Sequence, residues 1–217
     1  MSILICMPCY GGNVSEQTTL NLFNLGKLLV RQGIDHGIVT MANESLITKG
    51  RSKLANFFIN NTEYDYLFFL DADIGFQPED VLKLLSHQKE IVSGAYPMKT
   101  LPLKWNFSLS QPTKRQKNLI AIDKIGIGFT IIHRSVFEKI KSFYGEELKY
   151  TPDFNSNVPP TTKELNNSYH YFCEMKFNDR FLPEDLSFFA RAKECGVQAW
   201  MDSSINLKHV GSYIFRE

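Results

Sequence analysis

The feature that most constrains this chain is an uninterrupted apolar run, Tyr66-Leu67-Phe68-Phe69-Leu70, which ends in Asp71-Ala72-Asp73. An apolar run without alternation is typical of a strand buried on both faces, as in the middle of a parallel sheet. Because side chains repeat every second residue along a strand, Asp71 and Asp73 lean the same way where the strand ends. Ligands bind at this end of the strands in open α/β sheets. The pair therefore predicts a divalent-metal site that holds a phosphorylated ligand. A helix cap at Asp71 beside a solvated Asp73 is the alternative, and one aspartate would fit it better than two.

The composition describes an ordinary water-soluble protein. Of the 217 residues, 43% are hydrophobic and 22% charged, and the net charge of +1 lacks the basic excess of a nucleic-acid binder. No segment approaches the roughly 20 apolar residues that a membrane span needs, and the N-terminus does not resemble a signal peptide. We expect a single cytoplasmic domain over residues 1–217, or one catalytic domain of a longer polypeptide.

Four cysteines allow a metal or redox interpretation, which the spacing does not favour. Cys6 and Cys9 form a C-x-x-C pair, but zinc would need a second pair, and Cys173 and Cys195 are isolated. Cys6 also lies within an expected strand, whereas a redox pair normally opens a helix. We expect structural thiols in a reducing compartment.

Strand and helix patterns alternate through the first half of the chain. Ser15 and Gly33 have the positions of the cap and the terminator of the first helix, and Pro78 suits the first turn of the third. Strands are expected over residues 2–6, 37–41, 66–70 and 90–95. This alternation predicts an α/β fold with a mostly parallel central sheet flanked by helices.

The second half has a less regular pattern. Two apolar runs, 118–122 and 125–133, are expected to pair through Asp123-Lys124. The pattern then predicts a helix over 134–144, a loop over 151–162, a strand over 169–177, a helix over 183–195 and a short strand over 198–201.

Two further acidic residues and one histidine are candidates for chemistry. Glu184 and Asp185 directly follow Pro183 at the start of an expected helix. Acidic residues there commonly offset the helix dipole, but a carboxylate at this place can also act as a general base toward a bound sugar. His209 is a lone histidine near the C-terminus. Imidazole together with carboxylates suits Mn²⁺ as well as Mg²⁺.

Two segments indicate closer contact with a ligand. Arg51 lies near the start of the second helix, where a cation and free backbone N–H groups suit an anion, although a solvated helix end looks similar. Gly126 and Gly128 allow the backbone to approach another group closely, and a bend in a strand is the alternative.

Together these motifs resemble the GT-A-fold, nucleotide-sugar-dependent glycosyltransferases, with the D-x-D motif at 71–73. The segments that carry the resemblance, in the order of that fold, are residues 7–10, 50–55, 68–73, 93–96, 126–132, 181–188 and 206–211. The chain has no Q-x-x-R-W segment and no membrane helix, unlike the processive synthases of this fold. The resemblance thus implies a soluble enzyme that transfers single sugars.

Roles follow from the resemblance residue by residue. It implies that Asp73 and His209 bind Mn²⁺ or Mg²⁺ and that Asp71 contacts the ribose or the metal. Pro8, Tyr10 and Arg51 would hold the nucleotide of the donor, a nucleotide-diphosphate sugar, and Gly126 and Gly128 would leave room for its sugar. Asp185, beside Glu184, would deprotonate the hydroxyl of a glycan or glycoconjugate acceptor if the enzyme inverts.

Two other function classes remain open. Phosphohydrolases of the haloacid dehalogenase type also use D-x-D after an apolar strand, but on their first strand, and usually with Thr or Val where this chain has Gly75. A non-catalytic module that binds nucleotide sugars or glycans would keep the same metal site, and only turnover separates it from an enzyme.

Overall fold

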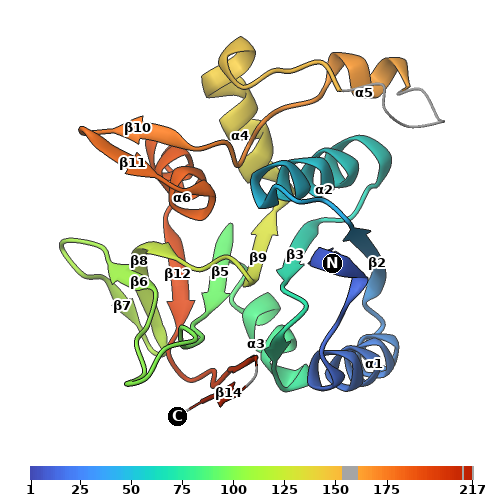
Figure 1. Cartoon of the computed structure of the whole chain (residues 1–217), viewed down its shortest axis with the longest axis vertical. Coiled ribbons are helices and arrows are strands. Elements are labelled where there is room, and N and C mark those ends of the chain that lie inside the picture. The colour runs from blue at the N-terminus through green and yellow to red at the C-terminus, as the bar shows by residue number, and fades with distance from the viewer. Residues whose placement is uncertain (153–160, 212, 217) are drawn as a thin grey trace.

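A nine-stranded sheet forms the centre of the molecule (Figure 1). The computed structural model describes residues 1–152, 161–211 and 213–216. Within them the strand order is β2-β1-β3-β9-β5-β12-β8-β6, and β7 pairs with β8. The strands are β1 (Ser2–Cys9), β2 (Asp35–Ala42), β3 (Tyr66–Leu70), β5 (Ile91–Gly94), β6 (Phe107–Leu109), β7 (Arg115–Gln116), β8 (Leu119–Ile125), β9 (Phe129–His133) and β12 (Ala199–Asp202).

Most strands of this sheet point in one direction. β1 is parallel to both β2 and β3, and β5 is parallel to β12. Only β9 and β8 are antiparallel to the strands beside them. Seven of the nine strands, all except these two, therefore run the same way. The predicted α/β fold with a mostly parallel central sheet is confirmed.

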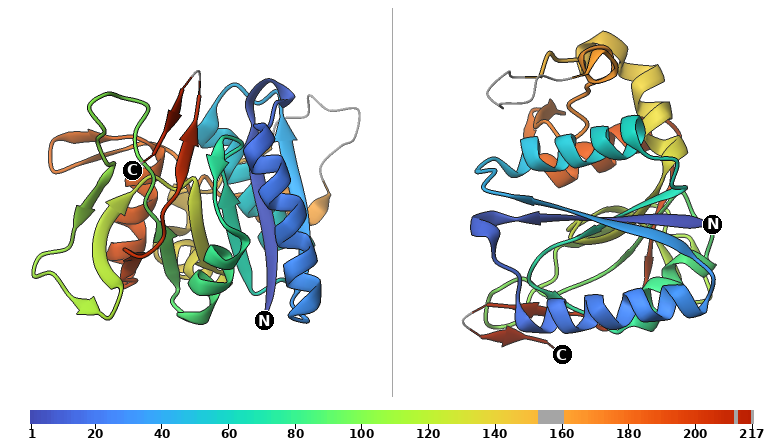
Figure 2. Two further views of the ribbon diagram at one scale, coloured as in Figure 1. Left: turned by 90° about the horizontal axis from the view of Figure 1, so that it is seen from below. Right: turned by 90° about the vertical axis from the view of Figure 1, so that its right-hand side faces the viewer.

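Helices cover both faces of the sheet (Figure 2). Leu25 and Leu29 of one helix pack with β1 and β3 in the core on one face. Phe58, Phe137 and Phe188, from three other helices, fill the core on the opposite face. The helices are α1 (Glu16–Arg31), α2 (Ile47–Asn61), α3 (Pro78–Ser86), α4 (Arg134–Tyr144), α5 (Thr162–Asn166) and α6 (Glu184–Glu194), with 3-10 turns η1 (Tyr10–Gly12) and η2 (Gly145–Glu147). None of the helices in the described ranges is both long and apolar enough to cross a membrane.

Capping residues define the predicted ends of the helices. The Ser15 side chain accepts a hydrogen bond from the Thr18 amide at 3.1 Å, which satisfies one of the free N–H groups of α1. Gly33, which follows α1, has φ +63°, a conformation that glycine adopts without strain. Gln77 and Asp80 form a capping box around Pro78 at the start of α3.

Two predictions for the second half are wrong: one of strand pairing and one of strand length. β8 continues through Asp123-Lys124 to Ile125, and it pairs with β12, β6 and β7, whereas β9 lies between β3 and β5. The run 169–177 is a strand only over β10 (Met175–Phe177). In the rest of that run, Tyr169 forms a single antiparallel bridge with Lys149, and Asn56 of α2 exchanges two 3.0 Å hydrogen bonds with the Tyr169 backbone. Most of the predicted 151–162 loop lies outside the described residues.

Two smaller sheets bring distant segments together. β13 (Lys208–Val210) pairs with β4 (Ile74–Gly75) and with β14 (Ile214–Phe215), so that the C-terminal segment lies against the turn after β3. β10 and β11 (Arg180–Leu182) form a hairpin directly before α6.

Candidate active site

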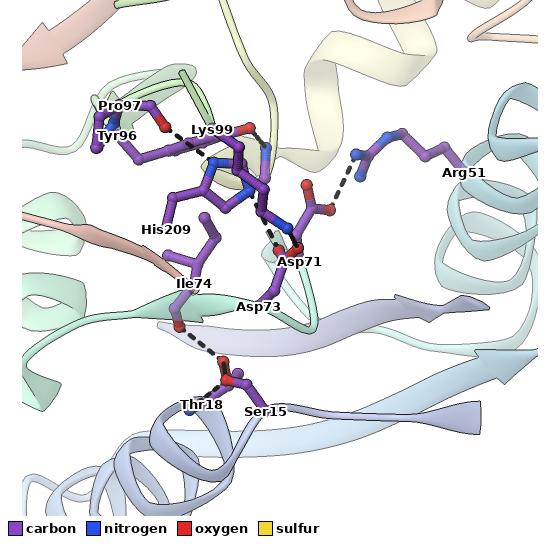
Figure 3. Close-up of polar contacts among 11 residues, drawn as sticks. Ser15, Thr18, Arg51, Asp71, Asp73, Ile74, Tyr96, Pro97, Lys99 and His209 are labelled. Atoms are coloured by element: carbon purple, nitrogen blue, oxygen red, sulfur yellow. Dashed lines mark hydrogen bonds and ion pairs between the residues drawn. The ribbon is translucent and has the colours of Figure 1, made fainter. Parts of the chain in front are cut away.

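The turn that carries Asp71 and Asp73 is held from several sides (Figure 3). The Asp71 amide donates to the Gly128 carbonyl at 2.9 Å, which ties the turn to the segment before β9. At the start of α1, the Ser15 amide donates to the Ala72 carbonyl at 2.8 Å. On the C-terminal side, Val210 of β13 donates its amide to the Asp73 carbonyl, also at 2.8 Å. These three hydrogen bonds fix the backbone that carries the two carboxylates.

Asp71 faces a buried arginine. Arg51 of α2 is 4% exposed, and its Nη2 lies 2.9 Å from Asp71 Oδ1. The guanidinium also lies over the Phe69 ring, and its Nε is 4.0 Å from Glu184 Oε1. Arg51 Nε and Nη1 are buried and have no hydrogen-bond partner among the described residues. Arg51 therefore links the D-x-D turn to the acidic pair at the start of α6.

Asp73 faces a histidine and a lysine (Figure 3). Lys99 Nζ lies 2.6 Å from Asp73 Oδ2, and His209 Nε2 lies 3.5 Å from Asp73 Oδ1. Burial raises the pKa of the Asp73 carboxyl, but His209 and Lys99 outweigh it, so the pKa lies below its usual value. His209 Nδ1 contacts the Pro97 carbonyl at 2.8 Å. Since a carbonyl only accepts, Nδ1 donates to Pro97, and Nε2 is the ring nitrogen directed toward Asp73.

The structure brings together two of the three predicted metal ligands. Asp73 and His209 are neighbours, whereas the Asp71 carboxylate is directed at Arg51. In the part of the chain that the structure describes, no three His, Cys, Asp or Glu side chains are grouped as a metal site. The four cysteines form no disulfide; Cys6 and Cys9 are buried, and Cys173 and Cys195 are half-buried.

Gly126 and Gly128 are packed against side chains of the site. A Cβ atom at Gly128 would lie 2.2 Å from Asp71 Oδ2, and one at Gly126 would lie 2.6 Å from Tyr96 Oη. The Gly128 amide donates to Tyr96 Oη at 3.1 Å. Burial and then the charge of Asp71 raise the pKa of Tyr96 far above its usual value. These glycines therefore let Asp71 and Tyr96 lie directly on the backbone.

Glu184 and Asp185 begin α6, with Pro183 as the cap residue. Asp185 Oδ1 accepts a hydrogen bond from the Leu186 amide at 2.8 Å, which fixes the side chain. Burial raises the pKa of Asp185, and burial followed by the neighbouring Asp185 charge raises the pKa of Glu184. A half-buried carboxyl with a raised pKa suits proton transfer near neutral pH.

The raised pKa of Glu184 predicts a pH-dependent cost in stability. The folded state holds this proton more tightly than the unfolded state, so stability falls as the pH rises from the unfolded pKa to the folded pKa. Glu184→Gln should therefore raise the free energy of unfolding at pH 7, and the gain should disappear below pH ~4, where the unfolded carboxyl is also protonated. Urea unfolding at both pH values measures this difference. A gain of equal size at both values would contradict it.

A cavity of about 200 Å³ lies beyond the ends of β1 and β2, where α/β sheets bind ligands. Pro8 and Tyr10, both predicted nucleotide contacts, line it together with Glu44 and Gly50. Tyr10 is 79% exposed and presents a ring face to solvent. Glu44 accepts a hydrogen bond from Lys53 at 2.7 Å.

Sequence reasoning missed Glu44, Tyr96 and Lys99. Tyr96 lies within the segment 93–96 that carries the resemblance, but its contact with Gly128, like that of Lys99 with Asp73, joins distant parts of the chain. Glu44 is relevant because it lines the cavity with Pro8 and Tyr10. The positions directly after strand ends, such as Glu44 after β2 and Tyr96 after β5, are the signal that could have found two of them.

Comparisons with known proteins give information on the fold of the chain alone. No family model and no curated protein matches the chain. The structure of A197 from STIV is 20% identical, with a TM-score of 0.55 over 97% of this chain and 86% of that one. GalNAc-T7 with UDP, GalNAc and Mn²⁺ is 11% identical, with a TM-score of 0.48 over 100% of this chain and 43% of that one. The 4-diphosphocytidyl-2C-methyl-D-erythritol synthase from Anaerococcus prevotii is 10% identical, with a TM-score of 0.39 over 69% and 78%. The last two scores are too low to support an argument, and the likeness to A197 shows a shared α/β fold alone.

Proposed function

We propose that this chain is a metal-dependent glycosyltransferase that moves a single sugar from a nucleotide-diphosphate sugar, a UDP-sugar, to a hydroxyl of a glycan or other acceptor. The observation that carries this proposal is the Asp73–His209 pair at the carboxyl edge of the sheet. It lies beside a buried Arg51–Asp71 ion pair and the acidic start of α6.

The residues around Asp73 fit a divalent cation. The Lys99 ammonium lies 2.6 Å from Asp73 Oδ2, so this carboxylate is already paired with a cation. His209 Nε2 faces the same carboxylate, and a carboxylate with an imidazole suits Mn²⁺ or Mg²⁺. Asp73 and His209 would hold the ion, with Asp71 as a further ligand directly or through water. When bound, the metal supplies Lewis-acid stabilisation of the charge on the departing diphosphate.

The nucleotide would occupy the cavity beyond β1 and β2. Pro8 and Tyr10 would contact the base, because both line that cavity and Tyr10 offers an exposed ring for stacking. Arg51 would act mainly by orienting Asp71, since it is enclosed and already bonded to that carboxylate. This role differs from the direct nucleotide contact that the resemblance implies for Arg51.

The proposed transfer needs one base and one leaving group. Asp185 would take the proton of the acceptor hydroxyl, whose oxygen forms a bond to the anomeric carbon of the donor sugar. The bond between that carbon and the diphosphate oxygen breaks, and UDP leaves with the electron pair. Gly126 and Gly128 would support the sugar site indirectly, because they let Asp71 and Tyr96 lie directly on the backbone, and not by leaving room for the sugar themselves.

The test is a panel of nucleotide sugars with Mn²⁺, compared with simple sugar phosphates. We expect UDP release that is slow in water and faster with an acceptor, and no inorganic phosphate from sugar phosphates. The third-strand position of Asp71 and its ion pair with Arg51 argue against a phosphohydrolase nucleophile. Robust phosphate release that is lost in Asp71→Asn would overturn the proposal. Binding without any turnover would instead identify a non-catalytic module.

Gly128→Ala should reduce transfer by about a hundredfold, because a displacement of about 1 Å in a reacting group has effects of this size. The new methyl group would meet Asp71 Oδ2 and Tyr96 Oη at 2.2 and 2.8 Å, so both side chains must move. Gly26→Ala in α1 is the matched control, since its nearest neighbour would be 3.9 Å away. Initial rates and melting temperatures of both variants measure the effect. Unchanged rates in Gly128→Ala would show that Asp71 need not occupy this position.

A further inference from the structure

A second cavity, of about 380 Å³, lies between the β10–β11 hairpin, α6 and the strands β6 and β8. Its volume is in the range of small-molecule sites. Phe177 and Leu182 of the hairpin and Leu186 and Ala190 of α6 form its apolar surface. It is separate from the cavity that Pro8 and Tyr10 line, so a donor bound there would leave this one free.

This cavity adjoins the candidate base. Leu186, the residue after Asp185, is part of its wall, and the Leu186 amide holds the Asp185 carboxylate. Lys124 of β8 also lines the cavity, and its charge acts to lower the pKa of Asp185 against the effect of burial. A molecule in this cavity would therefore contact the residue that directly follows the group proposed to take the acceptor proton.

Several charged side chains that line this cavity are paired with other residues. Lys193 is paired with Asp123 at 2.8 Å, and Glu194 accepts a hydrogen bond from Tyr144. Lys124 and Arg180, in contrast, form no hydrogen bond or ion pair through their side chains with any residue that the structure describes. The cavity thus combines an apolar surface with two cations that form no ion pair or side-chain hydrogen bond within the described part of the chain.

We infer that this cavity binds the acceptor, and that the acceptor is an anionic sugar whose carboxylate or phosphate pairs with Lys124 and Arg180. The inference rests on the proposed glycosyltransferase function and specifies its acceptor. A sugar ring has apolar C–H faces that suit the Phe177 side of the cavity, and charge-assisted hydrogen bonds to the anionic group are the strong ones.

The test compares matched ligands on the full chain. Binding of p-nitrophenyl β-glucoside, β-glucuronide and β-glucoside 6-phosphate is measured by ligand-observed NMR. At least one anionic ligand should bind about tenfold more tightly than the neutral one, as expected for charge-assisted contacts. Comparison of the glucuronide with the phosphate identifies the source of the charge. Lys124→Gln and Arg180→Gln should each weaken this preference, and Ala190→Trp should remove binding by filling the cavity.

Lys176→Gln is the control, because Lys176 belongs to the same hairpin but pairs with Asp179 and does not line the cavity. It should keep the full preference. Equal binding of all three ligands, no binding, or a preference that survives both charge substitutions would overturn the inference. UDP release from the donor in water, measured on the same protein, separates the two claims. Donor cleavage without anionic preference removes only the acceptor assignment, whereas anionic preference without donor cleavage overturns the proposed function.

Discussion

Asp73→Ala should abolish sugar transfer and the metal-dependent part of UDP binding while the fold stays intact. The substitution removes the carboxylate that faces His209 and Lys99, but the side chain is 37% exposed, so little core volume is lost. Isothermal titration of UDP with Mn²⁺ and with EDTA measures the metal-dependent part, and the melting temperature reports on the fold.

The control for this variant is Asp35→Ala. Asp35 is exposed at the start of β2, at the opposite end of that strand from the cavity, so its loss should change neither transfer nor UDP affinity. If Asp73→Ala bound UDP in Mn²⁺ as tightly as the unmodified protein does, Asp73 would not be a metal ligand.

Asp185→Asn should lower kcat by about 10² or more and leave donor affinity nearly unchanged, as expected when only a proton acceptor is lost. Asparagine keeps the oxygen that accepts from the Leu186 amide, so the start of α6 should not move. Glu79→Gln is a matched control: Glu79 likewise follows a proline in a first helical turn, but it lies in α3 and is exposed. A loss in kcat/KM that came from weaker donor binding alone would give Asp185 a positioning role.

The pH profile adds a second measurement for Asp185. A base must be deprotonated to act, and burial raises the pKa of Asp185. The acid limb of kcat/KM should therefore lie above the usual aspartate pKa of about 3.9. It should disappear in Asp185→Asn. Product anomers read by NMR show whether the reaction inverts and so needs this base.

Elements with strong local patterns could be predicted from the sequence. Strand β3 and helix α4 have the predicted bounds, because an unbroken apolar run and a clear helical period each specify one structure. The pairing of β8 and β9 could not be predicted in this way. β8 pairs with β12, β6 and β7, and β9 pairs with β3 and β5. The sequence around β8 and β9 does not indicate that β5 and β12 lie between them.

In the candidate site, too, local motifs could be predicted from the sequence and long-range contacts could not. The D-x-D turn, the acidic pair and His209 could be found as motifs, and the structure places Asp73 beside His209. The ion pair between Arg51 and Asp71, and the contact of Lys99 with Asp73, join residues 20 and 26 positions apart. These contacts depend on how α2 and the segment after β5 pack against the turn, which no local pattern encodes.

The central claim is that the bond between the anomeric carbon and the diphosphate is broken. Donor hydrolysis in ¹⁸O-labelled water with Mn²⁺, followed by mass spectrometry of the nucleotide, tests this claim most directly. Attack at the anomeric carbon should release UDP without ¹⁸O, and the free sugar should carry the label. Label in the nucleotide or in a phosphate product would mean that water attacks phosphorus, and that result would contradict a glycosyltransferase.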